Sequence, residues 1–162
     1  MTFMLSKDRQ GPPTELREKF ERYQDYLRSQ VARFPQSAYQ IATSEWYYSL
    51  TDPRSPHDGW LTDLQILEGP NGKPDSDRSI SIRLRLLNAQ QDRHIEYWYP
   101  RVSKYTLELA NGEWGHRDWR FDEFRLAEDG QVIHEIEWAA AGPTGHWVIV
   151  AADVQLRYLE AG

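Results

Sequence analysis

The chain has 162 residues, of which 40% are hydrophobic and 27% charged, a composition that predicts one soluble globular domain over residues 1–162. The absence of cysteine excludes disulfides and thiolate metal sites. Because no stretch suits a secretory signal or a membrane span, the expected location is cytoplasmic.

The charge is unevenly distributed. Residues 1–50 hold seven Lys/Arg against six Asp/Glu, and the rest holds twelve against nineteen, so the net charge of -6 divides into +1 and -7. This acidic balance argues against nucleic acid as a partner and favours a basic protein. Self-association is the alternative to a basic partner, and no membrane partner is expected because no stretch could span a bilayer.

Residues 14–50 are expected to form a helical part, after a flexible lead over residues 1–13 that ends in Gly-Pro-Pro. From Thr14, which can cap a helix, apolar side chains recur at spacings of three and four. The spacing predicts an amphipathic helix that ends before Pro35. Its apolar positions are Leu16, Phe20, Tyr23, Leu27, Val31 and Phe34.

The segment from residue 35 to residue 50 allows two interpretations. Ala38, Ile41 and Ala42 fit a second short helix, whereas the Trp46-Tyr47-Tyr48 run suits a strand. Residues 51–59 contain two Pro, two Asp and a Gly, and they predict a loop that separates the helical part from the rest of the chain.

From Trp60 onward the hydrophobic period changes to two, which predicts a β-sheet part over residues 60–160. Helix first and sheet after indicate an α+β fold, with the N-terminal amphipathic helix packed on an antiparallel meander sheet of about seven to eight strands. The strands are expected over residues 61–67, 78–87, 93–99, 102–109, 120–127, 131–139, 146–150 and 154–159.

Glu128-Asp129-Gly130 has the composition of a three-residue hairpin loop whose Gly takes the left-handed conformation. Counting back from this loop places Phe124 opposite His134 on one sheet face and Glu123 opposite Glu135 on the other.

A second register follows from residues 78–99. Aligning Leu84 with Tyr97 on the apolar face also aligns Arg85 with Glu96 on the polar face. One register therefore satisfies both faces of this strand pair.

The paired glutamates are chemically unusual, because like charges directly across a ladder are destabilising. In one interpretation, Glu123 and Glu135 share a proton or a divalent cation, as acid/base pairs and hard-metal sites require. In the other, Arg125 neutralises both carboxylates on a solvated face that also carries Glu137.

The alternation places His134 inward, with Asp122 on the same side of the sheet. A buried neutral histidine is the simpler interpretation and a catalytic base is the alternative, which an approach of Asp122 to His134 would favour. With Glu135, these two residues are the catalytic candidates. The chain has no glycine-rich phosphate loop, G-x-S-x-G or H-E-x-x-H motif.

Two loop segments that precede predicted strands contain paired candidates for a metal site, His57 with Asp58 and His116 with Asp118. Together they would supply ligands for zinc or another divalent ion. Neither spacing matches an established motif, and both aspartates can cap turns instead, so no metal and no cofactor is expected.

The segment His57-Asp58-Gly59-Trp60-Leu61, with residues 119–126 and 133–138, resembles small uncharacterised bacterial proteins over the sheet-forming part of the chain. In size, acidity and lack of catalytic motifs, the chain also resembles the immunity proteins of bacterial toxin systems. This resemblance implies a single-domain binding protein, and it transfers no functional residues.

The leading hypothesis is a non-enzymatic protein-binding domain, of the immunity-inhibitor type, whose acidic sheet face contacts a basic partner. Trp98 and Trp114 are expected to be exposed and suited to partner contact. The partner-binding residues would be Trp98, Glu123, Arg125, Glu135 and Glu137.

The first alternative is a small-ligand or metal-dependent enzyme with a site around Asp122, Glu123, His134 and Glu135. A deep pocket containing His134 and Asp122 would favour the enzyme, whereas a flat acidic surface would favour the binder. The second alternative is a structural homodimer joined through a sheet edge or through the aromatic face of a strand.

Overall fold

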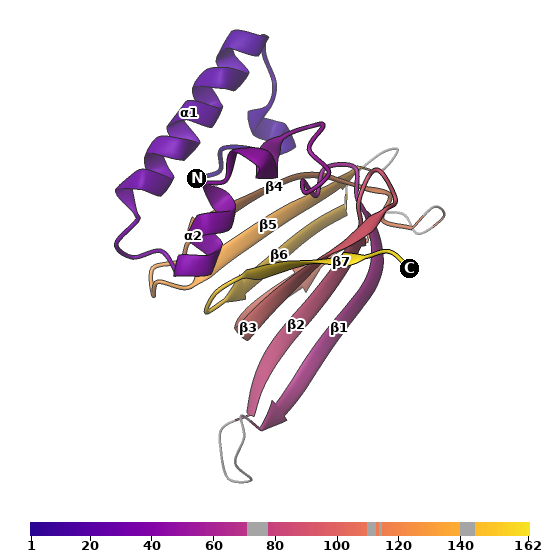
Figure 1. Ribbon diagram of the computed structural model, residues 1–162. Coiled ribbons are helices and arrows are strands. Elements are labelled where there is room, and N and C mark those ends of the chain that lie inside the picture. Colours follow the sequence, from indigo (N-terminus) through magenta and orange to yellow (C-terminus); the bar gives the residue numbers. More distant parts are fainter. Residues whose placement is uncertain (71–77, 110–112, 114, 140–144) are drawn as a thin grey trace.

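The computed structural model describes residues 1–70, 78–109, 113, 115–139 and 145–162. Within these residues, two α-helices precede a seven-stranded antiparallel sheet, so the predicted α+β fold is confirmed (Figure 1). The helical elements are η1 (Ser6–Asp8), α1 (Pro13–Ser29), α2 (Gln36–Ala42) and η2 (Glu45–Tyr48). The strands are β1 (Trp60–Pro70), β2 (Arg78–Leu87), β3 (Arg93–Leu107), β4 (Asp118–Leu126), β5 (Val132–Ala139), β6 (Gly145–Ala151) and β7 (Gln155–Glu160).

The helical part differs from expectation in where α1 stops. Residues 30–34 form turns rather than a continuation of α1, and the Gln30 N–H donates to both the Tyr26 and the Leu27 carbonyl oxygens. A shared bond of this kind is common where a helix tightens and ends. Of the two interpretations of residues 35–50, the helix is confirmed: α2 and the 3-10 helix η2 occupy the segment, and Tyr47 points into the core.

The sheet is organised around β3, its longest strand. Along one edge β3 pairs with β2, and along the other its first half pairs with β7 and its second half with β6. The order continues from β6 to β5 and β4, while β1 lies beyond β2 and meets β4 only at Trp60 and Asp118.

The strands expected over residues 93–99 and 102–109 are one strand, which gives seven strands rather than eight. Pro100 and Arg101 lie at the junction, where the register with β2 shifts and Arg101 has a φ of 48°; the register with β6 shifts just after it, between Val102 and Lys104. Since proline has no N–H to donate, an irregularity lets the strand bend without leaving the sheet.

Both predicted registers are confirmed. Phe124 faces His134 and Glu123 faces Glu135 across the β4–β5 hairpin, whose Gly130 has a φ of 84°. Leu84 faces Tyr97 and Arg85 faces Glu96 across β2 and β3, and the Arg85 Nη2 to Glu96 Oε2 distance is 2.7 Å.

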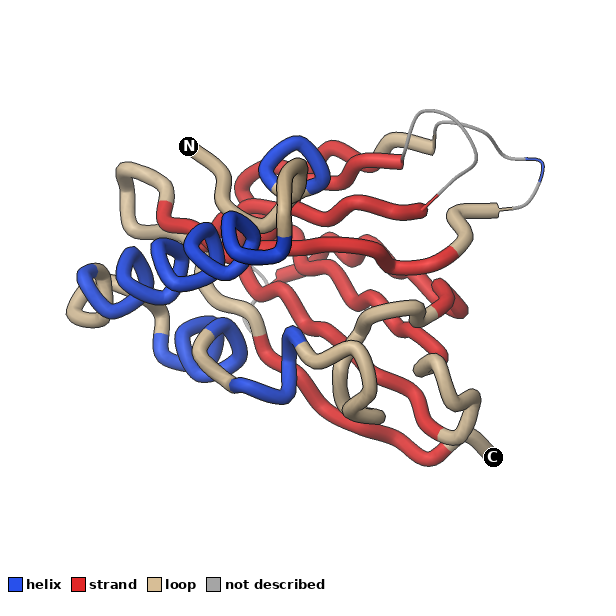
Figure 2. The backbone as a smooth tube through the Cα atoms, turned by 90° about the horizontal axis from the view of Figure 1, so that it is seen from above, coloured by secondary structure: helices blue, strands red, loops and turns tan. Residues whose placement is uncertain are grey.

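The hydrophobic core lies between the inner face of the sheet and the helices, which gather on one side of it (Figure 2). Tyr23 and Tyr26 of α1 also close the free edge of β4. The Tyr23 hydroxyl accepts a hydrogen bond from the Phe124 N–H and donates to the Phe124 carbonyl oxygen, and the Tyr26 hydroxyl accepts from the Leu126 N–H. These bonds satisfy backbone groups that an edge strand would otherwise leave unpaired.

Part of the segment before α1, residues 3–6, is docked on the sheet, where the sequence predicts a flexible lead over residues 1–13. Met4 and Leu5 are buried, and Phe3 stacks on Tyr26 with ring centroids 5.1 Å apart. Burial of this apolar pair, together with hydrogen bonds from the segment's backbone to the sheet, offsets the entropy of ordering the chain.

Candidate functional site

The paired glutamates lie on the outer face of β4 and β5 and share one cation. The Arg125 guanidinium contacts both the Glu123 and the Glu135 carboxylates. The His146 Nε2 lies 2.6 Å from the other Glu135 oxygen. Arg125 therefore compensates the like-charge pair, as one of the two interpretations expected.

This acidic cluster is covered, not solvated. The Phe3 and Met4 N–H groups donate to Glu123 at 2.8 and 2.6 Å, and the Ser6 N–H donates to Glu137 at 2.8 Å. Glu123, Glu135 and Glu137 are all buried. The expectation of an exposed acidic face is wrong because the N-terminal segment uses Glu123 and Glu137 to satisfy its own backbone donors, while Arg125 and His146 contact Glu135.

Burial and hydrogen bonding together shift the pKa values of Glu123 and Glu135 in opposite directions. Burial raises the pKa of Glu123 above its usual value, even though the backbone donors and Arg125 oppose this. For Glu135, burial acts in the same sense, but hydrogen bonds from Arg125 and His146 outweigh it and lower the pKa.

His134 and Asp122 do approach each other, inside the core. His134 Nε2 lies 2.8 Å from Asp122 Oδ2, and His134 Nδ1 lies 2.8 Å from the Tyr99 hydroxyl. Tyr47 donates to Asp122 Oδ2 at 2.6 Å, and the Trp119 indole N–H donates to Oδ1 at 3.0 Å. His134 also stacks on Phe124 with ring centroids 4.1 Å apart.

One arrangement of protons satisfies the whole network. Burial raises the pKa of Tyr99 well above its usual value, so its hydroxyl stays protonated and can donate to Nδ1. With a proton on Nε2, His134 donates to Asp122, whose side-chain oxygens accept three hydrogen bonds in all. Such a network fixes one arrangement of these buried side chains, with both Asp122 oxygens occupied by donors.

A cleft of about 430 Å³ opens beside this network, between the N-terminal segment, α1, η2 and β4. We call it the N-terminal cleft. Asp122 and Tyr47 lie at its floor, whereas His134 is behind Asp122 and is not among its lining residues. The walls are largely apolar and include Phe3, Met4, Leu16, Phe20, Tyr48 and Phe121.

The charge of the N-terminal cleft is opposite to that of the chain. Four cationic side chains, Arg9, Arg17, Lys19 and Arg120, line it against the carboxylates of Glu45 and Asp122, a balance of +2 with His57 neutral. The overall net charge is -6.

Two of these cations have no carboxylate partner among the described residues. Arg17 pairs with Glu21 at 3.0 Å and Lys19 with Glu15 at 3.3 Å. Arg9 and Arg120 instead lie over the same Phe121 ring, 4.3 and 5.5 Å from its centroid. Burial and the neighbouring charge of Arg120 lower the pKa of Arg9.

The two predicted metal pairs do not come together. His57 lies 3.2 Å from its neighbour Asp58 and lines the N-terminal cleft. His116 packs against the Trp138 and Trp147 rings and, with Asp118, lines a separate hollow beside Trp60. In the part of the chain that the structure describes, no group of three or more His, Asp or Glu side chains is placed to hold a metal ion.

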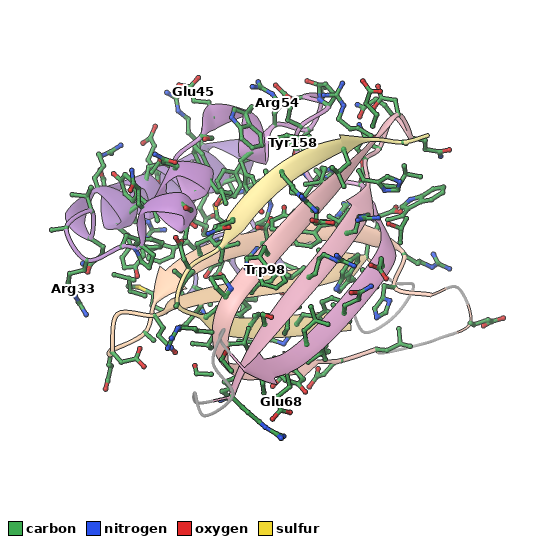
Figure 3. All side chains as sticks on the ribbon, turned by 60° about the horizontal axis from the view of Figure 1, so that its bottom comes forward. Arg33, Glu45, Arg54, Glu68, Trp98 and Tyr158 are labelled. Carbon is green, nitrogen blue, oxygen red and sulfur yellow. The ribbon has the colours of Figure 1, made fainter. Side chains whose placement is uncertain are left out.

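Trp98 is partly exposed on the sheet face turned away from the helices, beside Arg83, Glu96 and Arg157 (Figure 3). Trp114 lies outside the described residues. Trp98 therefore has basic neighbours rather than the rim of carboxylates that the binding hypothesis expects.

Sequence reasoning missed the cationic residues of the N-terminal cleft, because Arg9 falls in the segment expected to be flexible and Arg120 has no partner along its strand. The Met4-Leu5 pair is the signal that would have indicated a docked segment, since Met and Leu are among the residue types most often buried.

Comparisons of the chain with protein-family models, with curated proteins and with solved structures find no match. No relative therefore assigns a role to any of these residues. Among the described residues, none of the helices is long and apolar enough to cross a bilayer.

Proposed function

We propose that this protein binds a small organic anion with an apolar body in the N-terminal cleft and does not transform it. The observation that carries the proposal is the pair of guanidiniums, Arg9 and Arg120, which converge on Phe121 without a carboxylate partner among the described residues. An anionic group between them would relieve their mutual repulsion and accept hydrogen bonds from both.

The size and lining of the cleft support a small ligand rather than a protein. Its volume of about 430 Å³ falls within the range of small-molecule pockets, roughly 300–1,000 Å³. Phe20, Tyr48 and Phe121 offer aromatic surface for an apolar body, and the cations at the same site would fix the position of its charged end.

The alternatives from the sequence gain less support. Glu123, Glu135 and Glu137 are buried, and Glu123 and Glu137 are bonded to the chain's own N-terminal segment, so an immunity-type inhibitor would need another surface. The enzyme alternative is favoured by the position of Asp122 at the cleft floor, but this carboxylate already accepts three hydrogen bonds. Binding without catalysis is consistent with both the buried glutamates and the hydrogen-bonded carboxylate of Asp122.

The test compares two probes that share an aromatic body. 8-Anilinonaphthalene-1-sulfonate carries a sulfonate, and N-phenyl-1-naphthylamine does not. Fluorescence titration of the wild type, Arg9→Gln and Arg120→Gln should show that each substitution weakens sulfonate binding by roughly 3- to 10-fold, because each removes one charge-assisted contact. The affinity for the uncharged probe should stay the same.

Arg28→Gln is the matched control, because Arg28 is exposed on α1 and does not line the cleft. If the sulfonate binds equally well to all four proteins, or if the substitutions weaken both probes alike, the cationic pair does not recognise an anion and the proposal fails.

A further inference from the structure

Strand β1 has one edge without a strand partner over most of its length. It pairs with β2 from Trp60 to Pro70, and on its other side it meets β4 only at the pair Trp60 and Asp118. Within the described residues, the edge from Asp63 to Gly69 therefore faces no other strand. The β1–β2 hairpin reaches away from the two helices (Figure 1).

This edge has little of the usual protection against pairing. Natural sheets shield exposed edges with charged side chains, above all lysine, and with proline, bulges or covering side chains. β4 has Tyr23 and Tyr26 over its edge. The segment from Asp63 to Gly69 has a charge only near each end, Asp63 and Glu68, and contains no Lys, Arg or Pro. The one register irregularity of β1 lies before it, between Leu61 and Asp63.

The same segment exposes apolar side chains. Ile66 and Leu67, which point to opposite faces, are each 43% exposed. Ile66 lies opposite Ile82, a core residue, so the apolar inner face of the sheet continues onto the hairpin beyond the part that the helices cover. An open, apolar edge of this kind is a template for another strand.

We infer that β1 pairs antiparallel with β1 of a second copy of this chain, about a two-fold axis at Gln65. In this register Leu64 faces the partner's Ile66 on the inner face, and Asp63 faces the partner's Leu67 on the outer face. No two carboxylates lie opposite each other, and the two-fold axis closes the assembly as a dimer.

Neighbouring registers fit less well. A two-fold axis at Ile66 places Leu64 opposite the partner's Glu68, which sets a charge against an apolar residue on the inner face; the axis at Gln65 confines such a mismatch, Asp63 against Leu67, to the outer face. An axis at Leu64 brings the irregularity between Leu61 and Asp63 into the paired segment. Self-complementarity about Gln65 is what selects a second copy of this chain over an unrelated strand.

The test exploits the pairing of Leu67 with Asp63, which occurs twice in the dimer. Leu67→Lys would place an attractive pair at both positions, and Leu67→Glu a repulsive one. Sedimentation equilibrium over a range of concentrations should show that the wild type dimerises and that the dimer of Leu67→Lys is about tenfold tighter than that of Leu67→Glu.

Tyr105→Lys and Tyr105→Glu are the matched controls, because Tyr105 is exposed on β3 and is not on the edge of β1. They change the net charge by the same amounts as Leu67→Lys and Leu67→Glu, but away from the paired edge, so the two Tyr105 variants should dimerise equally. A wild type that stays monomeric at every concentration, or Lys and Glu variants at position 67 that dimerise equally, would overturn the inference.

A second measurement needs no substitution. The backbone amides from Asp63 to Gly69 that do not bond β2 should exchange with solvent more slowly as the concentration of the wild type rises, because pairing protects them. Exchange rates that do not depend on concentration would overturn the inference. Neither experiment involves the N-terminal cleft, so the outcome is independent of the proposed function.

Discussion

Glu123 and Glu135 face each other across the β4–β5 ladder, and both are buried. Two carboxylates in this position repel each other unless a cation lies between them, and Arg125 contacts both. The hairpin therefore depends on one guanidinium, which is itself mostly shielded from water.

Arg125→Ala should destabilise the protein by about 3 kcal/mol at pH 7, because it leaves two buried carboxylates without their cation. The loss should be smaller at pH 4. The pKa of Glu123 is raised, so this carboxyl takes up a proton early as the pH falls and the repulsion disappears. Urea unfolding of both proteins at the two pH values measures the difference.

The pKa of Glu135 tells how the stability of the wild type changes with pH. Because this pKa is lowered in the folded protein, the carboxylate contributes stability above its unfolded pKa, about 4.3. That contribution is lost as the pH falls through the folded pKa. Arg28→Ala, on the exposed face of α1, is the control and should have little effect at either pH. An equal loss for Arg125→Ala at pH 7 and pH 4 would contradict the electrostatic coupling.

Much of this hairpin could be predicted from the sequence because its determinants are local. Glu128-Asp129-Gly130 sets the turn, and a turn of fixed length sets the register of the strands on either side, which then places Glu123 opposite Glu135. The pairing of Arg85 with Glu96 was predictable for the same reason.

The packing of the N-terminal segment over these strands could not be predicted in this way. Phe3 and Met4 donate to Glu123 across a sequence separation of 120 and 119 residues, and no periodicity encodes such a contact. Alternation predicts which residues share a face, but it does not say whether that face is solvated. Asp122 and His134 show the same limit: their shared face was predictable, whereas the bond from Tyr47 to Asp122 joins parts of the chain with no local relation.

Asp122→Asn should lower stability and raise the affinity of the N-terminal cleft for an anion. The amide cannot accept all three hydrogen bonds that the carboxylate accepts, and each buried donor left unpaired costs roughly 1–3 kcal/mol. The substitution also removes a negative charge from the cleft floor, so 8-anilinonaphthalene-1-sulfonate should bind about 2- to 5-fold more tightly.

Thermal unfolding and fluorescence titration measure the two effects on the same protein sample. Asp25→Asn, on the exposed side of α1, is the matched control and should change neither. A variant that loses stability but binds the sulfonate no better would show that the charge of Asp122 does not act on the ligand.

Leu5→Ala tests whether the N-terminal segment is docked. Leu5 is 1% exposed, whereas Leu50 is 67% exposed, so the same substitution at the two positions compares a core contact with a surface one. Leu5→Ala should lower the free energy of unfolding by about 2–4 kcal/mol, and Leu50→Ala by less than about 0.5 kcal/mol.

The Phe3 and Met4 amides should also exchange slowly with solvent, because they donate to Glu123. Equal losses for the two leucine variants, with fast exchange at Phe3 and Met4, would mean that residues 1–8 do not cover the acidic cluster and that Glu123 and Glu137 are open to solvent.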